Sequence, residues 1–166
     1  MTTITILAEQ LGARLMALGA QVTTAESCTG GGIAEAITRI PGSSAWFEAG
    51  FVTYSNRQKT TQLGVPAGLF ASVGAVSREV VEAMALGAGQ RSEARFAVAV
   101  SGIAGPEGGT PEKPVGTVWL AWADGRQVHA QRFQFVGDRA GVRRQSIETA
   151  LVGLTRLAVG ENPLEG

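Results

Sequence analysis

Two kinds of apolar spacing alternate along this chain. Residues 4–18 and 33–40 carry apolar side chains at helical intervals, and so does the segment that follows Asp138. Residues 21–26 contain the β-branched run Val22-Thr23-Thr24, and residues 96–100 are continuously apolar, which is typical of strands. The continuous stretch predicts a strand buried on both faces, because a strand with one face in water alternates instead. The alternation therefore predicts an α/β fold with helices on both sides of a sheet.

The second half of the chain predicts a β-hairpin. Residues 115–123 and 127–136 have strand character and flank Asp124-Gly125, a dipeptide favoured in tight hairpin turns. A hairpin adds antiparallel strands to a sheet whose other strands are joined through helices. We therefore expect a single three-layer α/β/α domain over residues 1–159, with a mixed sheet that includes this C-terminal hairpin. Residues 160–166 are rich in turn formers and are expected to fray.

Serine residues mark the starts of two further helices. Ser55 followed by Gln58 fits the reciprocal capping pattern, so a helix is predicted to begin there, after a strand at residues 50–54. Ser77 is predicted to cap another helix, because its hydroxyl can accept a hydrogen bond from a free N–H group of the first turn. Asp138 can cap the last helix in the same way.

Composition excludes several classes of protein. The 166 residues include 14 basic and 14 acidic side chains, and this balance argues against a nucleic-acid partner. A single cysteine, Cys28, allows no internal disulfide and no cysteine zinc site, and the single histidine cannot build a metal cluster. The apolar runs fall short of the roughly 20 residues that span a membrane, and no signal peptide is evident. We therefore expect a soluble cytoplasmic protein without a metal.

The absence of familiar catalytic motifs narrows the chemistry. The sequence contains no Gly-x-x-x-x-Gly-Lys phosphate loop, no Gly-x-Ser-x-Gly elbow and no Ser-x-x-Lys pair. These absences argue against a P-loop nucleotidase, an α/β-hydrolase and a penicillin-binding enzyme.

The first candidate site is the glycine-rich segment 26–32. It follows a predicted strand and opens a predicted helix, where free backbone N–H groups attract an anion or a developing oxyanion. Ser27, Cys28 and Thr29 place nucleophilic side chains there, and the glycines allow a ligand to approach the backbone. A plain strand–helix turn, capped by Ser27 or Thr29, explains the same residues.

The second candidate site is Lys59 with Tyr54. Lys59 is expected near the first turn of the helix that begins at Ser55, where the helix dipole opposes a positive charge. The dipole and any burial both lower the pKa of a lysine, which makes it a usable general base. Tyr54 at the strand end can pass or steady a proton. The alternative is a solvated lysine beside a packed tyrosine.

Two further segments can complete a pocket. Residues 101–109 leave the most apolar strand, and ligands of open α/β sheets bind outside the carboxyl ends of strands. Arg139 lies at a helix start, near Arg143 and Arg144, where the dipole disfavours a cation unless an anion is close. A phosphate explains this placement, and so does a surface ion pair.

Seven segments in this order resemble the CinA C-terminal domain family, whose stand-alone members include nicotinamide-nucleotide amidases. They span most of residues 21–145, and seven in register are specific although each alone is weak. Longer members carry an additional N-terminal domain that is missing here, so we expect the stand-alone form. The segments are 24–31, 42–47, 50–56, 74–77, 101–106, 113–118 and 137–139.

The resemblance implies hydrolysis of the carboxamide of nicotinamide mononucleotide to nicotinic acid mononucleotide and ammonia, in pyridine-nucleotide recycling. It also implies Ser–Lys catalysis without metal or cofactor, with Ser27 as nucleophile, Lys59 as base and Tyr54 as assisting hydroxyl. This agrees with the residues, because a serine needs a neighbouring base and no Ser–His pair is evident. We expect a neutral Lys59 in contact with Ser27, and an oxyanion held at the start of the second helix. The predicted substrate-binding residues are Thr29, Gly30, Gly31, Ser101, Gly102, Ile103, Ala104, Gly105 and Arg139.

Two alternatives stay open at this point. One keeps the amidase but makes Cys28 the nucleophile, because a thiolate at a helix N-terminus is chemically attractive. The other is a non-catalytic nucleotide-binding or regulatory module linked to competence or DNA damage, for which the combination of Ser27, Tyr54 and Lys59 is not needed. In either case we expect a homo-oligomer, since two-fold assemblies are common among small enzymes.

Overall fold

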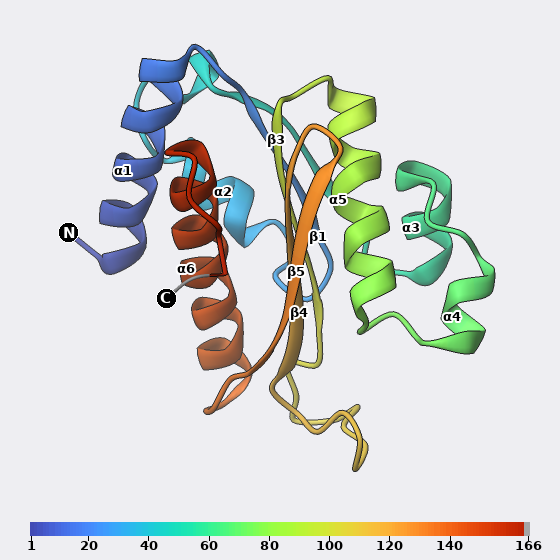
Figure 1. Ribbon diagram of the computed structural model, residues 1–166. Helices are drawn as coiled ribbons and strands as arrows, with labels where there is room; N and C mark the ends of the chain where they lie inside the picture. Colours follow the sequence, from blue (N-terminus) through green and yellow to red (C-terminus); the bar gives the residue numbers. More distant parts are fainter. Residues whose placement is uncertain (165–166) are drawn as a thin grey trace.

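Five strands form one mixed sheet in the computed structural model, which describes residues 1–164 (Figure 1). The strand order is β2-β1-β3-β4-β5. The first pairs are parallel, β1 with β2 and β1 with β3, whereas β3–β4 and β4–β5 are antiparallel. This confirms the mixed sheet with its C-terminal hairpin. The strands are β1 (Val22–Glu26), β2 (Phe47–Val52), β3 (Phe96–Gly102), β4 (Thr117–Asp124) and β5 (Gln127–Gln134).

Helices cover both faces of this sheet and confirm the three layers (Figure 1). On one face lie α1 (Thr3–Leu18), α2 (Gly32–Thr38) and α6 (Arg139–Ala158). On the other lie α3 (Asn56–Leu63), α4 (Gly68–Ser72) and α5 (Arg78–Ser92). The sequence did not predict α4 or the 3-10 turn η1 (Ser43–Ala45), because five and three residues are too few to display helical periodicity.

Each helical layer buries its own hydrophobic cluster against the sheet. The α1–α2–α6 cluster contains large side chains such as Leu11, Trp122 and Leu151. The α5 cluster is lined on its sheet side by alanines, among them Ala99 and Ala121, which let α5 lie close to the strands. Because β3 faces one cluster with its valines and the other with its alanines, it is buried on both faces as predicted.

The strands end at slightly different residues from those expected, and this shapes the carboxyl edge of the sheet. β2 covers 47–52 instead of 50–54: it begins at Phe47, which pairs with Val22, and it ends before the chain turns at Ser55 to start α3, although Thr53 still donates its N–H to Glu26. β3 runs on to Gly102, since Ser101 and Gly102 still pair with β4. The hairpin strands are 117–124 and 127–134, shorter at their outer ends than expected.

The predicted helix caps are confirmed. Ser55 accepts a hydrogen bond from the N–H of Gln58, Ser77 from Val80 and Asp138 from Gly141. The second hydrogen bond of the capping pattern, from the N–H of Ser55 to the Gln58 side chain, differs from the expectation. Gln58 Oε1 instead accepts a hydrogen bond of 2.8 Å from Gln62 Nε2.

The expected fraying of the last residues stays a prediction. Residues 165–166 lie outside the described part, while Pro163 is buried and Leu164 packs against the α1–α2–α6 cluster.

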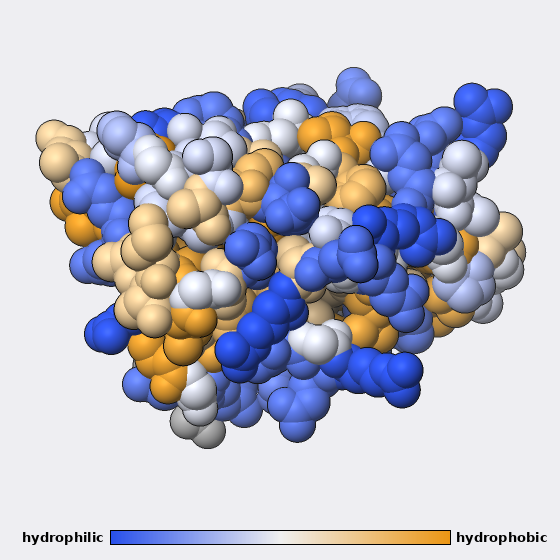
Figure 2. Space-filling model, turned by 90° about the horizontal axis from the view of Figure 1, so that it is seen from above, coloured by the Kyte–Doolittle hydropathy of each residue, from blue (hydrophilic) through white to orange (hydrophobic). Residues whose placement is uncertain are grey.

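The end of the molecule seen in Figure 2 lies opposite the β3–β4 loop. It is covered mostly by hydrophilic residues, with apolar ones gathered toward α1. Within residues 1–164 no helix has the length and apolar character needed to cross a bilayer.

One glycine allows α5 to approach the end of α3. A Cβ atom on Gly87 would lie 1.9 Å from the carbonyl oxygen of Leu63, which is backbone and cannot rotate away. We predict that Gly87→Ala lowers the free energy of unfolding by about 1–3 kcal/mol or more, as overpacking does. Gly89→Ala in the same helix is the control, because its Cβ meets nothing closer than 3.8 Å. Chemical denaturation of both variants checks this, and equal stabilities would contradict it.

Candidate active site

The segments that follow β1, β2 and β3 meet at the carboxyl edge of the sheet, together with the N-terminus of α6 (Figure 1). They enclose a cavity of about 290 Å³, here called the Ser27 cavity. A second cavity of about 700 Å³ adjoins it and shares Ala104 and Arg139 with it. The residues that line the Ser27 cavity are Ser27, Cys28, Tyr54, Asn56, Lys59, Ala75, Val76, Ser101, Gly102, Ile103, Ala104, Gly105, Glu107, Gly108 and Arg139.

The structure brings Ser27 and Lys59 together across 32 positions of sequence. Lys59 Nζ lies 3.0 Å from Ser27 Oγ and 2.9 Å from the carbonyl oxygen of Tyr54. Ser27 is 8% exposed and Lys59 only 1%. When protonated, the amine donates to both oxygens; when neutral, it can donate to Tyr54 and accept the hydroxyl proton of Ser27.

Burial sets the protonation of this amine. Loss of hydration lowers the pKa of Lys59 from the ordinary lysine value of 10.5. Within the described residues its hydrogen bonds go to uncharged oxygens only, so no carboxylate bonded to it restores the charged form. A buried amine of this kind is suited to take a proton from a neighbouring hydroxyl.

Tyr54 meets Lys59 through its backbone and not through its hydroxyl. The side chain is 58% exposed, and its hydroxyl accepts a hydrogen bond of 3.0 Å from Arg139 Nη2. Arg139 Nη1 donates at 3.0 Å to the carbonyl oxygen of Gly105. Arg139 therefore ties the segment after β2 to the segment after β3 across the mouth of the Ser27 cavity.

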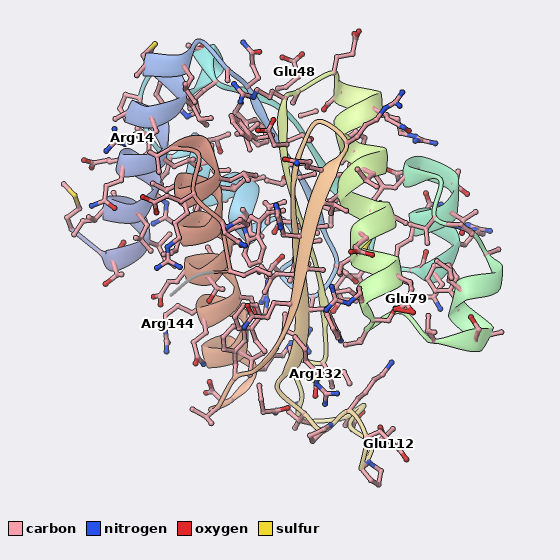
Figure 3. All side chains as sticks on the ribbon, in the orientation of Figure 1. Arg14, Glu48, Glu79, Glu112, Arg132 and Arg144 are labelled. Atoms are coloured by element: carbon pink, nitrogen blue, oxygen red, sulfur yellow. The ribbon has the colours of Figure 1, made fainter. Side chains whose placement is uncertain are left out.

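The end of β3 and the segment after it form one wall of the cavity, which Ser101 and the next four residues line. Ile103 donates its N–H to the carbonyl oxygen of Thr117, which holds this wall on β4. A Cβ atom on Gly102 would lie 2.6 Å from Val118, so a glycine is needed for the approach. Farther along, Glu112 lies near the tip of the projecting loop, and Arg132 of β5 donates to its carbonyl oxygen at 2.8 Å (Figure 3).

Thr29, Gly30 and Gly31 are not among the residues that line the Ser27 cavity, in contrast to the expectation. The hydroxyl of Thr29 points to Glu26 and donates to Oε1 at 2.6 Å. Gly30 and Gly31 have φ values of 58° and 101°, so they provide the left-handed turn that leads into α2.

The sequence analysis assigned no individual role to six residues that line or support the cavity: Glu26, Asn56, Ala75, Val76, Glu107 and Gly108. Most of them lie inside or directly beside the segments that carry the family resemblance, so position beside a matched motif was the available signal. Glu26 lies inside the matched segment 24–31, but a carboxylate at the end of a buried strand does not show which neighbours it contacts.

Cys28 also borders the cavity, but its thiol is held in the protonated form. Burial raises the pKa of Cys28 to about 11, and the nearby Glu26 carboxylate acts in the same direction. At neutral pH the thiolate is therefore scarce, in contrast to the reactive cysteine that a helix N-terminus can produce.

The fold and the buried Ser27–Lys59 pair define an α/β domain with a hydroxyl–amine pair at the carboxyl edge of its sheet. The chain belongs to the CinA C-terminal domain family, whose model matches residues 4–158. This confirms the resemblance described above.

Two curated relatives cover most of the chain. It is 70% identical over 157 residues to nicotinamide-nucleotide amidohydrolase PncC of Pseudomonas putida, covering 95% of this chain and 98% of the relative. It is 57% identical over 146 residues to PncC of Escherichia coli K12, covering 87% and 88%. A solved CinA superfamily protein of Klebsiella pneumoniae superposes with a TM-score of 0.92 at 38% identity, over 96% of this chain and 99% of that one.

Proposed function

We propose that this protein hydrolyses the carboxamide of nicotinamide mononucleotide, giving nicotinic acid mononucleotide and ammonia in pyridine-nucleotide recycling. The observation that carries the proposal is the buried contact of 3.0 Å between Lys59 Nζ and Ser27 Oγ at the wall of a cavity. The activity named for relatives at 70% and 57% identity supports the choice of substrate.

The proposed reaction begins with neutral Lys59. Its amine takes the proton of Ser27 as Oγ attacks the amide carbon, while the Tyr54 carbonyl keeps the amine oriented. The protonated amine then gives this proton to the –NH2 group of the tetrahedral intermediate, the C–N bond breaks, and ammonia leaves. Water hydrolyses the acyl-enzyme, and Ser27 recovers its proton. A neutral Lys59 also avoids a second cation beside the pyridinium ring of the substrate.

The position expected for the oxyanion has to be revised. The N–H groups of Ile33 and Ala34, in the first turn of α2, donate to the Glu26 carboxylate, so they are not free for a ligand. The N–H groups of residues 28 and 104 make no hydrogen bond to another residue within 1–164, and both residues border the cavity. We propose these two as donors to the oxyanion.

The rest of the substrate is proposed to extend past Arg139. This side chain borders both the Ser27 cavity and the adjoining one, which Arg143 also lines. Two guanidinium groups on α6 suit a phosphate. For the hydroxyl of Tyr54 we propose an assisting role through Arg139, to which it is hydrogen bonded.

An assay of ammonia release tests the proposal. The protein is incubated separately with nicotinamide mononucleotide, nicotinamide riboside and nicotinamide, before and after dialysis against a chelator. We expect ammonia from the mononucleotide alone, and no effect of the chelator. Calorimetric binding of the mononucleotide without ammonia would favour a non-catalytic nucleotide-binding module instead.

Cys28 provides a test of which side chain is the nucleophile. We expect Cys28→Ala to release ammonia at a rate within about threefold of the unchanged protein, because burial keeps the thiol protonated and alanine preserves the backbone N–H. Steady-state kinetics check this. A loss comparable to removal of a catalytic group would transfer the nucleophile from Ser27 to Cys28.

We also propose that the protein self-associates, with two-fold symmetry as the simplest arrangement. Light scattering coupled to size exclusion would give the mass directly, and a mass of 17.2 kDa, that of one chain, would contradict this proposal.

A further inference from the structure

The carboxylate of Glu26, the residue next to Ser27, has no role in the reaction steps described above. It is fully buried, 0% exposed, and stands directly before Ser27 at the end of β1. Its oxygens accept three hydrogen bonds: from Thr29 Oγ1 at 2.6 Å, and from the N–H groups of Ile33 and Ala34 at 2.9 Å each. A carboxylate with this many partners is held in one orientation.

The backbone around Glu26 is fixed on the sheet side as well. Its carbonyl oxygen accepts the N–H of Thr53 at 2.9 Å, and the N–H of Ser27 donates to Val100 at 3.0 Å. The first bond ties this end of β1 to the segment that leads to Lys59. The second ties it to β3, whose continuation forms the cavity wall.

The turn that carries Ser27 is therefore clamped from two directions. Strand neighbours hold its start, and the Glu26 side chain reaches past the turn to hold Thr29 and the first turn of α2. The turn closes on itself through Gly30, whose N–H donates to the carbonyl oxygen of Ser27 at 3.0 Å. Without the carboxylate, one buried and one part-buried N–H group of α2 would lose their acceptor, and the Thr29 hydroxyl would lose its partner. The turn would then be held to α2 by backbone hydrogen bonds alone, from Gly32 to Thr29 and from Glu35 to Gly31.

We infer that Glu26 is a positioning residue, which fixes Ser27 Oγ against Lys59 Nζ by clamping the turn 27–31 between β1 and α2. It acts through the turn and touches neither substrate nor the reacting atoms. This inference rests on the proposed function only in one respect: its kinetic test measures ammonia release from the proposed substrate. A displacement of about 1 Å at a nucleophile can lower turnover by on the order of 10²-fold, which sets the expected size of the effect.

Glu26→Gln is the main variant, because glutamine keeps the size but offers one acceptor oxygen in place of two. We expect kcat for ammonia release to fall by about 10- to 100-fold, with KM changed less than threefold and the acid limb of the pH profile unmoved. Thr29→Val removes one of the three hydrogen bonds and is expected to lower kcat by a smaller factor. Glu35→Gln is the matched control on the same helix, because Glu35 is exposed and pairs with Arg39. It should leave kcat unchanged.

A second readout separates this inference from the choice of substrate. A fluorophosphonate probe reacts with an activated serine, and the mass increase of the intact protein gives its rate at Ser27. We expect slower labelling in Glu26→Gln than in the unchanged protein, whether or not the mononucleotide is the substrate. If kcat per folded molecule and the labelling rate are both unchanged in Glu26→Gln and Thr29→Val, Glu26 is only a structural cap. If the acid limb disappears in Glu26→Gln, Glu26 is itself the base. Either result overturns the inference.

Discussion

Replacing Ser27 by alanine is expected to reduce ammonia release from nicotinamide mononucleotide by about 10⁴-fold or more. The hydroxyl oxygen is the atom that would form the acyl-enzyme, and removal of the serine nucleophile of a serine protease lowers kcat by on the order of 10⁶-fold. The fold should survive, because alanine fits a site that is 8% exposed and only the bond to Lys59 is lost. Ammonia assays and thermal unfolding, measured side by side, check both expectations.

The control for this change is Ser72→Ala, which removes an exposed hydroxyl from α4, away from the cavity. Its activity should equal that of the unchanged protein. If Ser27→Ala kept substantial turnover, the acyl-enzyme route would have to be abandoned, whatever the substrate.

Replacing Lys59 by methionine is expected to abolish turnover to a similar extent while making the protein more stable at neutral pH. Methionine fills the same space but cannot take a proton, so Ser27 would lose its base. It also removes the unfavourable burial of an amine that is 1% exposed. Kinetics and thermal unfolding should therefore move in opposite directions, and a fall in both would contradict this account of Lys59.

The lowered pKa of Lys59 also predicts how activity and stability vary with pH. Because the neutral amine is the base, kcat/KM should rise with pH through the Lys59 pKa, which burial places below 10.5. Between that pKa and 10.5 the unfolded chain binds a proton that the folded chain does not, so stability should increase with pH in this window. In Lys59→Met that increment should disappear from the pH dependence of the unfolding free energy.

Features of the fold that depend on local chemistry could be predicted from the sequence. The caps at Ser55, Ser77 and Asp138 follow from hydroxyl or carboxylate groups that accept nearby N–H donors, and the hairpin follows from its Asp-Gly turn. The doubly buried β3 follows from an unbroken apolar stretch. Each of these signals lies within a few residues of the structure that it predicts.

Features that depend on long-range placement could not be predicted in the same way. From the sequence, Thr29 is equally suited to contact a ligand or to cap a helix. Only the position of Glu26 shows that the Thr29 hydroxyl turns away from the cavity. For the same reason the sequence could not show which N–H groups of α2 are free for a ligand and which already donate to the Glu26 carboxylate. The pairing of Ser27 with Lys59 was expected through the family resemblance, because no local pattern links residues 32 positions apart.

The two ends of the β4–β5 hairpin lie at opposite ends of the sheet, and only one of them is near the Ser27 cavity. Its turn joins Asp124 to Gln127 beside the start of β3, because Asp124 pairs with Phe96, whereas Thr117 at the opposite end lies next to the cavity wall. A fluorescent reporter or an affinity handle inserted in that turn would thus sit at the remote pole of the molecule. The hairpin turn is therefore an attachment point that leaves the residues around the Ser27 cavity unchanged.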